Sequence, residues 1–394
     1  MKQSVAQFLG LKKSMVVLLG MVVLVGMGER LGERFLPIYL QTLGGGVVLL
    51  GLFGGMNNLL GALYSFPGGY LSDRFGYKRA LIFFNLLSMA GFLIVALIPH
   101  RAAVLAGAAL FLSWSAISLP ATMSMISRVL PSGKRTMGVS MHALVRRIPM
   151  AFGPVIGGLL IGWFGMVDGI RYAFAAAALL GAISLIFQQT MIEEPSKKDR
   201  RAEANPFALF RQMSPALRRL LASDILIRFC EQIPYVFVVV WCVRNVGVSP
   251  LEFGVLTAIE MATAVLVYIP VAWLADRTAK RPFIIVTFGF FALFPLVLLL
   301  SGSMELLVTA FVVRGLKEFG EPARKAMIME LSPPGKEAGM FGLYYLLRDT
   351  IVSMAAFGGA FLWDISPELN LLAAAGFGLI GMILFAATGP DKSE

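Results

Sequence analysis

The chain has 394 residues, of which 58% are hydrophobic and only 14% are charged. Soluble globular proteins are nearer half apolar and a quarter charged, so the composition excludes an ordinary soluble domain. The formal net charge of +11 raises the question of a nucleic-acid partner, but the basic residues gather on one side of a series of apolar runs, which argues against one.

Apolar runs of the length that spans a bilayer, about 20 residues, recur along the whole chain. The first follows Lys12 and Lys13 but lacks a small-residue cleavage site, so it is predicted to be a span rather than a signal peptide. The sequence therefore predicts an all-α membrane protein with short loops. The twelve predicted helices are 14–41, 47–70, 80–99, 103–128, 138–163, 170–191, 218–243, 250–274, 282–301, 305–330, 338–363 and 369–388.

Lys and Arg are distributed unequally about these spans. With the N-terminus inside, 21 of the 34 fall in cytoplasmic segments and ten within spans, and only Arg101, Arg171 and Arg244 fall outside. This positive-inside asymmetry predicts that both termini lie in the cytoplasm. We expect a multi-pass protein of the plasma membrane, the inner membrane in a Gram-negative bacterium, and no nucleic-acid partner.

The chain divides into two similar halves. A charged, proline-containing stretch predicts an N-terminal six-helix bundle at 1–192, a cytoplasmic linker at 193–217 and a C-terminal six-helix bundle at 218–394. The segment YLSDRFGYKRALIFF (70–84) returns as WLADRTAKRPFIIVT (273–287), and PATMSMISRVLPSGK (120–134) returns as PARKAMIMELSPPGK (322–336). Such repeats are typical of transporters in which two bundles move about a central site.

The segment GGYLSDRFGYKR resembles the loop between helices 2 and 3 of the major facilitator superfamily, and the resemblance extends over the whole chain. It implies two pseudo-symmetric bundles, a secondary transporter and a gating role for the loop. We expect Asp73 to stabilise the state closed to the cytoplasm, and Arg277 or Arg281 to reach Glu330; the flanking basic residues could instead only fix topology. The residues of the motif and its weaker copy are Gly69, Asp73, Arg74, Gly76, Lys78, Arg79, Asp276 and Arg277.

A second segment, GPVIGG (153–158), resembles the helix 5 signature of exporters in that superfamily. Two residues depart from the exporter pattern. Pro149 stands where the signature has a glycine, and Leu112 stands where many proton-coupled exporters carry an arginine in helix 4. These departures weaken the assignment to drug exporters, though not to the superfamily.

Eighteen charged residues fall inside the predicted spans. A charge at the bilayer centre costs about 2.5–3.5 kcal/mol, so these groups must face one another or water. Because helical residues turn by about 100°, the charges of helix 1 share one flank and those of helix 10 fall within about 120°. The alternative is that ion pairs only define packing. We predict a substrate or proton pathway of Glu29, Arg30, Glu33, Arg34, Arg146, Arg147, Asp224, Arg228, Glu231, Arg314, Lys317, Glu318, Glu321, Arg324, Arg348 and Asp349.

Two prolines follow acidic residues in corresponding helices of the two halves. Pro37 comes after Glu33 in helix 1, and Pro234 comes after Glu231 in helix 7. They either loosen the backbone at these points or serve packing. Glu260 is alone in the interior of predicted helix 8.

The sequence has no Gly-x-x-x-x-Gly-Lys-Ser/Thr loop, so we expect an ion gradient rather than ATP to drive the protein. A carboxylate in a poorly hydrated site binds a proton readily and releases it when an arginine pairs with it. The coupling ion is therefore predicted to be H⁺, carried first by Glu33 or Glu231 and next by Asp349 or Glu318. No cofactor or metal is expected.

These features predict an alternating-access transporter, not an enzyme, that works as a monomer with a small-molecule substrate in the lipid bilayer. The slight excess of basic groups and the exporter-like helix 5 favour proton-coupled efflux of an amphipathic or anionic compound. Two alternatives stay open. One is a proton symporter that imports a small organic anion, and the other is a non-transporting membrane sensor, for which the linker is short.

Overall fold

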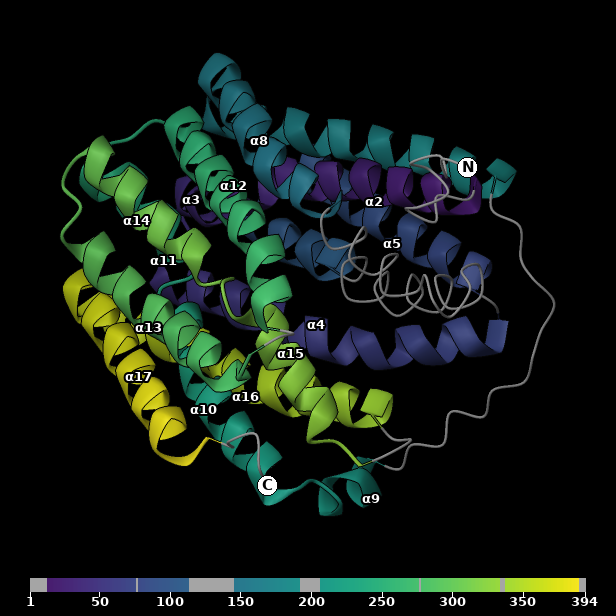
Figure 1. Ribbon diagram of the computed structural model, residues 1–394. Helices are drawn as coiled ribbons and strands as arrows, with labels where there is room; N and C mark the ends of the chain where they lie inside the picture. Colours follow the sequence, from purple (N-terminus) through teal and green to yellow (C-terminus); the bar gives the residue numbers. More distant parts are fainter. Residues whose placement is uncertain are drawn as a thin grey trace, which may run out of the picture. The chain divides into compact units, whose positions relative to one another are not determined.

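The computed structural model describes residues 13–75, 77–112, 145–191, 206–275, 278–333 and 337–389, in which every regular element is helical (Figure 1). The elements of the N-terminal half are α2 (Lys13–Gly32), η1 (Glu33–Phe35), α3 (Leu36–Thr42), α4 (Val47–Phe75), α5 (Tyr77–Leu97), the helix Arg101–Leu112 and α8 (Arg147–Met191). Those of the C-terminal half are α9 (Pro206–Arg211), α10 (Pro215–Gln232), α11 (Phe237–Val240), η3 (Trp241–Val246), α12 (Pro250–Ala275), α13 (Lys280–Leu299), α14 (Met304–Leu316), α15 (Glu321–Glu330), α16 (Glu337–Ile365) and α17 (Pro367–Thr388).

Internal contacts divide the chain into two compact units. Unit 1 contains Met1–Gly44, Leu60–Arg201 and Ser249–Val255, and unit 2 contains Gly45–Leu59, Ala202–Val248 and Leu256–Glu394. The first half of α4 therefore packs with unit 2, and the first turns of α12 pack with unit 1. The end of the predicted linker is helical, because α9 lies within it, whereas residues 192–205 lie outside the described part of the chain.

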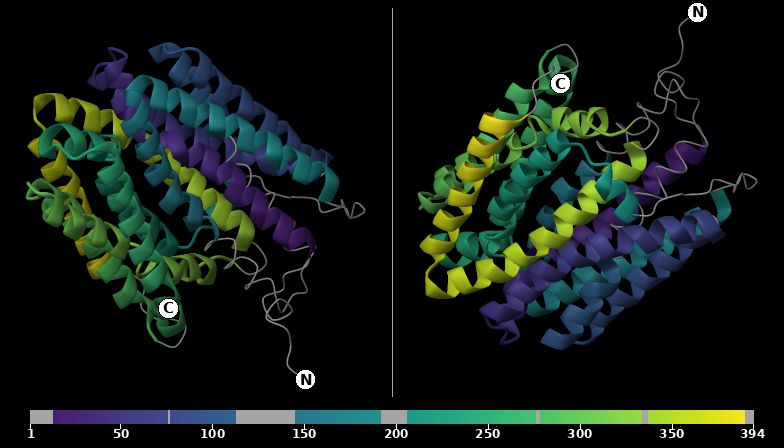
Figure 2. Two further views of the ribbon diagram at one scale, coloured as in Figure 1. Left: turned by 90° about the horizontal axis from the view of Figure 1, so that it is seen from above. Right: turned by 90° about the horizontal axis from the view of Figure 1, so that it is seen from below.

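In unit 1, helices α2 and α5 both pack on α8, and the purple α2 runs alongside blue and teal helices in Figure 2. Residues 147–163 of the predicted helix 138–163 and the predicted helix 170–191 form the two arms of α8, whereas residues 138–144 lie outside the described part of the chain. They meet at a kink at Gly165, whose φ of 77° lies in the left-handed region that glycine adopts without strain. Phe92 of α5, Phe111 of the helix Arg101–Leu112 and Phe174 of α8 form an aromatic core between these three helices, with ring centroids 5.3–6.0 Å apart.

In unit 2, helices α10 and α13 both pack on α17, and α16 packs against α10 (Figure 1). Leu217, Leu220 and Phe288 are fully or almost fully buried in the hydrophobic cluster that these helices share with α15. This cluster surrounds a set of charged side chains. The fold of unit 2 thus places polar groups inside a bundle whose outer faces are apolar.

Three predicted helices are interrupted, which corrects the expectation of continuous spans at 14–41, 218–243 and 305–330. The first changes to a 3₁₀ turn at Glu33–Phe35 just before Pro37, and the second leaves the α-helix at 233–236 around Pro234. The third breaks between Leu316 and Glu321. Proline lacks the N–H that continues a helix, which explains the positions of the first two breaks.

The third break depends on glycine as well as proline. A Cβ at Gly320 would lie 2.3 Å from the Phe283 carbonyl oxygen of α13, so only glycine allows this approach. Pro322 then occupies the first turn of α15, where a missing N–H costs no helical hydrogen bond. The charges predicted to share one arc of a single helix 10 therefore belong to two helices and the turn between them. They are Arg314 in α14, Lys317 and Glu318 in the turn, and Glu321, Arg324 and Lys325 in α15.

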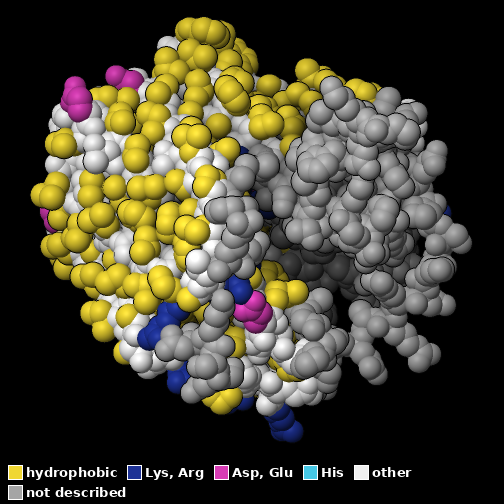
Figure 3. Space-filling model, in the orientation of Figure 1, with side chains coloured by type: hydrophobic (Ala, Val, Ile, Leu, Met, Phe, Trp, Pro, Cys, Tyr) yellow, Lys and Arg dark blue, Asp and Glu magenta, His cyan; other side chains and the backbone are white. Residues whose placement is uncertain are grey.

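Six described helices are long and apolar enough to cross a membrane, and the apolar stretches Val47–Gly61, Leu81–Leu97 and Arg101–Leu112 are shorter. In Figure 3 hydrophobic side chains cover the part of unit 2 formed by α13, α14 and α17, and Lys and Arg side chains gather along its lower margin. The exposed apolar side chains include Leu266 of α12, Leu293 of α13 and Leu300, which directly follows α13. Such a surface suits lipid contact. Of the predicted helix 103–128, residues 113–128 lie outside the described residues.

Candidate functional site

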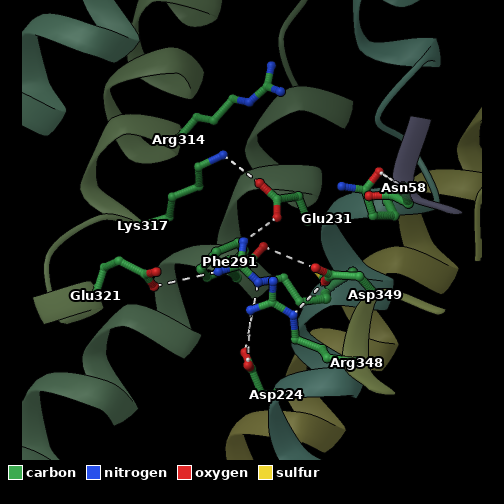
Figure 4. Close-up of polar contacts among 12 residues, drawn as sticks. Asn58, Asp224, Glu231, Phe291, Arg314, Lys317, Glu321, Arg348 and Asp349 are labelled. Atoms are coloured by element: carbon green, nitrogen blue, oxygen red, sulfur yellow. Dashed lines mark hydrogen bonds and ion pairs between the residues drawn. The ribbon is translucent and has the colours of Figure 1, made fainter. Parts of the chain in front are cut away.

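The charged side chains of unit 2 form one connected network, and Glu231 lies near its middle. The two oxygens of this carboxylate have different partners. Arg228 in the same helix donates from NH1 to Glu231 Oε2 at 2.7 Å, while Lys317 donates from Nζ to Glu231 Oε1 at 2.7 Å. Figure 4 shows Lys317 and Glu231 pointing toward each other. The carboxylate therefore joins α10 to the turn between α14 and α15.

One branch of the network runs from Lys317 to Glu260. Lys317 Nζ lies 3.5 Å from Glu260 Oε1, and Arg314 Nε lies 3.3 Å from the same oxygen. Glu260 and Arg314 are almost completely buried. The buried charge of Glu260 in α12 is thus satisfied by two cations of the α14 segment, as the insertion cost of a buried charge requires.

The other branch runs from Arg228 to Asp224 one turn earlier on α10. Asp224 accepts hydrogen bonds from Arg324 and from the Tyr344 hydroxyl, the latter at 3.0 Å, and Arg348 NH1 lies 3.4 Å from its Oδ2. Asp224 and Arg324 are each only 1% exposed. Buried charges of this kind are stable only when paired, so Asp224 links α10, α15 and α16.

Glu321 and Asp349 complete the network. Glu321 accepts two hydrogen bonds from Arg324, at 2.7 and 3.0 Å, and also lies 3.5 Å from Arg228 and 3.4 Å from Lys325. Asp349 accepts from Arg348 Nε at 2.7 Å. The network therefore extends over four segments: α10, α12, α14 with α15, and α16.

Aromatic rings flank the cations of this network. The Phe291 ring of α13 lies beneath both Arg228 and Lys317, with centroid distances of 5.2 and 5.7 Å. The Tyr345 ring lies 4.1 Å from the Arg348 guanidinium and 5.8 Å from that of Arg324. Cation–π contacts of this kind stabilise partly desolvated cations. Phe291 gives Arg228 and Lys317 a shared support that does not depend on the charge state of Glu231.

In unit 1 the predicted charges gather around the end of α2. Arg30 donates to Glu33 at 2.5 Å and also lies 3.6 Å from Glu29. Arg30 and Glu33 thus form an i,i+3 pair, and Arg228 and Glu231 form a pair of the same spacing in α10. Arg34, Arg146 and Arg147 are half-buried. Arg146 lies close enough to Glu29 and Arg30 to experience their charges.

Glycines of the exporter-like segment place α8 directly against this part of α2. A Cβ at Gly153 would lie 2.6 Å from the Arg30 Cβ, and one at Gly157 would lie 1.8 Å from the Leu31 carbonyl oxygen. Pro149, the departure from the exporter pattern, contacts Gly26 in the same groove, where a Cβ would lie 3.0 Å from the proline Cγ. The segment GPVIGG thus has a packing role in this chain.

The gating motif is only partly described. Gly69, Asp73 and Arg74 belong to the last turns of α4, and Lys78 and Arg79 belong to the first turn of α5, where the Arg79 side chain is exposed. Gly76, Asp276 and Arg277 lie outside the described residues. Glu330 is paired with Lys280, the residue before the Arg281 expected from the sequence. The gating role stays a prediction.

Sequence reasoning missed several residues of the network. Glu260 lies alone in the interior of its predicted helix. The free-energy cost of inserting an unpaired charge into the membrane is the signal that predicts a cationic partner for it. Tyr344, Tyr345 and Phe291 carried no signal, because aromatic residues are common in apolar helices. Glu318 is half-buried in the turn between α14 and α15. Within the described residues, no three His, Cys, Asp or Glu side chains form a group that could hold a metal ion.

The family follows from the sequence as a whole. The family model of the Major Facilitator Superfamily matches residues 18–230 and again residues 220–394. The chain belongs to the major facilitator superfamily. The double match agrees with the internal repeat, and it confirms the predicted family.

Two curated proteins are similar to this chain in sequence. An uncharacterised MFS-type transporter of Methanocaldococcus jannaschii is 20% identical over 360 residues, which cover 89% of this chain and 88% of the relative. A protein of Lactococcus lactis subsp. lactis described as a multi-drug resistance efflux pump PmrA homolog is 29% identical over 180 residues, or 44% of each chain.

Solved structures of transporters share the fold. A peptide transporter POT has a TM-score of 0.78 at 17% identity and covers 95% of this chain and 94% of its own. The nucleoside transporter NupG has a TM-score of 0.77 at 14% identity, covering 95% and 99%, and a D-xylose–proton symporter has 0.76 at 14%, covering 96% and 98%. At these identities the likeness shows the fold. It confirms the predicted all-α membrane architecture of two pseudo-symmetric bundles.

Proposed function

We propose that this superfamily member is a proton-coupled exporter of amphipathic or anionic organic compounds that works by alternating access. In this proposal a proton moves down its gradient through the carboxylates of the interrupted helices, while the substrate moves out of the cell. Glu231 is the first candidate for the proton carrier and Glu33 the second.

The observation that carries the proposal is the divided coordination of Glu231. One oxygen is bound by a cation of its own helix and the other by Lys317 of a different segment. Binding of a proton would remove the charge that attracts Lys317 and would loosen the contact between α10 and the α14–α15 turn. Proton loss would restore it. A carboxylate that joins two segments can thus convert proton binding into a relative movement of those segments.

The position of the break in α10 supports the same proposal. Glu231 lies in the last turn of α10. That turn ends at Gln232, and the next four residues, 233–236, are not helical. Interrupted helices are typical of transporter sites, because they free backbone groups and allow one half of the helix to move relative to the other. The carboxylate is therefore placed where a small change in pairing would move a helix end.

Two observations support export and an anionic portion in the substrate. The first is that the Lactococcus lactis relative is described as an efflux pump homologue, which supports export. The network of unit 2 contains six cations, namely Arg228, Arg314, Lys317, Arg324, Lys325 and Arg348, against the five acids Asp224, Glu231, Glu260, Glu321 and Asp349. Neutralisation of one of these acids by a proton would increase the excess of positive charge.

The test is flux in proteoliposomes that contain the purified protein under an imposed pH gradient, across a panel of amphipathic anions, cations and neutral compounds. The proposal predicts that an anionic compound moves opposite to the proton gradient and that a protonophore stops the movement. Movement in the same direction as the protons would identify a symporter instead. No flux of any compound, with the protein shown to be folded, would favour a sensor.

A further inference from the structure

The first half of α4 forms a strap, defined here as residues 47–58, that packs within unit 2. Gly51, Gly54, Gly55 and Asn58 are spaced i, i+3, i+4 and i+7, so they share one face of the helix. Three residues without a side chain followed by a polar one predict a face built for very close helix contact that ends in a hydrogen bond.

The strap contacts α16 and the break of α10 through its backbone. A Cβ at Gly51 would lie 2.5 Å from the Ala360 Cβ of α16, and one at Gly55 would lie 2.4 Å from the Phe357 ring. A Cβ at Gly54 would lie 2.9 Å from the Val236 Cγ1 in the break of α10. No side chain larger than hydrogen fits at these positions without a shift of the neighbouring elements.

Asn58 ends this face with a specific hydrogen bond. Its Nδ2 donates to the Gln232 Oε1 at 2.9 Å and to the Gly54 carbonyl oxygen at 3.3 Å. Gln232 is the last residue of α10 and follows Glu231 directly. In Figure 4 Asn58 lies close to the end of α10 that carries Glu231. The strap is therefore tied to the same helix end as the candidate proton carrier.

The opposite side of the break is held by a second asparagine. Asn370 of α17 is fully buried and donates to the Ile233 carbonyl oxygen at 3.3 Å and to the Gly359 carbonyl oxygen at 2.7 Å. Asn58 and Gln232 are only half-buried. Opening the half-buried Asn58–Gln232 bond should cost less than removing Asn370, because a fully buried carbonyl deprived of Asn370 would stay unsatisfied. The two ties therefore differ in how easily they open.

We propose that the Asn58–Gln232 hydrogen bond is a latch that holds the strap against α16 and opens during transport, while Asn370 keeps the α10 break attached to α16 and α17. Asn58 is then a positioning residue that links the end of α10 to the strap. The inference goes beyond the coupling ion and the substrate class. Its main test uses neither a substrate nor a proton gradient, so its failure is distinct from failure of the proposed function.

The test measures how often the strap leaves α16. Ser353 is buried on the face of α16 that meets Gly55, because a Cβ at Gly55 would lie 3.1 Å from the Ser353 carbonyl oxygen. A Ser353→Cys variant introduces a near-isosteric thiol whose labelling by a small maleimide requires the strap to separate. Cys230 and Cys242 are buried, and labelling of the parent chain gives their background.

Adding Asn58→Leu to Ser353→Cys should raise the labelling rate about fivefold, the population shift expected from losing about one net hydrogen bond. The exchanged pair Asn58→Gln with Gln232→Asn keeps one donor and one acceptor, and should restore the slow rate. Gly61→Ala, on the same helix where a Cβ meets nothing within 4 Å, should leave the rate unchanged. In transport assays Asn58→Leu should change the turnover number with an unchanged KM, and the exchanged pair should restore it.

Two results would overturn the latch. The first is unchanged labelling in a folded Asn58→Leu variant, which would make the bond incidental. The second is an exchanged pair that keeps the parental thermal midpoint but labels as fast as Asn58→Leu, which would assign the effect to packing of the asparagine side chain. If Asn58→Leu does not fold, Gln232→Leu in the Ser353→Cys chain removes the same bond from its other side. Faster labelling of that variant supports the latch, and the parental rate contradicts it.

Discussion

The two halves of the chain contain the same local pair in different surroundings. Arg30–Glu33 and Arg228–Glu231 share an i,i+3 spacing, and both lie at or within two residues of an interruption of their helix. The first pair lies against the glycines of α8, where Gly153 faces Arg30. The second is continued by Lys317, which binds the other oxygen of the glutamate from another segment.

This difference shows why a sequence repeat need not repeat a mechanism. Close packing of two helix backbones at glycines is favourable in one arrangement only, because the van der Waals contact is lost as soon as the helices separate. An ion pair can exchange partners, and a proton can switch it off. The neighbourhood of Glu231 therefore offers more scope for movement than the contact between α2 and α8, and we place Glu231 ahead of Glu33 as the proton carrier.

The largest effect is expected where the network is most buried. Asp224→Asn leaves Arg324 and Arg348 without their shared anion and should lower the free energy of unfolding by about 3–5 kcal/mol, as for other broken buried pairs. The exposed pair Asp168–Arg171 of unit 1 is the matched control, because Asp168→Asn there should cost at most about 1 kcal/mol. Thermal midpoints in detergent measure both, and equal shifts would contradict the comparison.

The second effect tests the glycine contacts of unit 1. Gly157→Ala would place a Cβ against the Leu31 carbonyl oxygen and should cost about 1–3 kcal/mol by overpacking. Gly162→Ala lies on the same arm of α8 with nothing within 4 Å of the new Cβ. It should be neutral or slightly stabilising in thermal unfolding. A neutral Gly157→Ala would show that α2 and α8 are not held by this contact.

Much of the fold could be predicted from the sequence, because apolar length and loop charge are local signals. The predicted helices 250–274 and 338–363 match α12 and α16 to within a few residues. The interruptions were less predictable. Pro37 and Pro234 marked two of them, but the break before Glu321 depends on the contact of Gly320 with the α13 backbone, which no local pattern reveals.

The candidate site was predictable only as a set of charges. Helical spacing was enough for the pair Arg228–Glu231, since both residues lie on one helix. It was not enough for Lys317, Glu260 or Asp224, because the pairs Arg314–Glu260, Lys317–Glu231 and Arg348–Asp224 join residues that are 54, 86 and 124 positions apart in the chain. Tertiary packing determines which residues form such pairs, and the local patterns of a single sequence do not reveal that packing.

The smallest effect is expected for Glu33. Glu33→Gln keeps the shape and hydrogen bonding of the side chain, and the glycine contacts of α8 continue to hold the helix. Uphill accumulation of substrate in proteoliposomes should therefore stay within about twofold of the parent, or about 0.4 kcal/mol. Loss of accumulation with downhill exchange intact would instead assign the proton to Glu33 and reverse the order of the two glutamates.

The most direct test of the account is the coupling of Glu231→Gln. The amide cannot cycle a proton, so proton-driven accumulation should be lost, while counterflow exchange of labelled substrate, which needs no net proton movement, continues. Glu252→Gln, an exposed carboxylate whose Oε2 accepts from the Ser249 N–H, is the control and should behave as the parent. If Glu231→Gln still concentrates substrate against its gradient at the parental rate, Glu231 is a structural charge and the central claim is wrong.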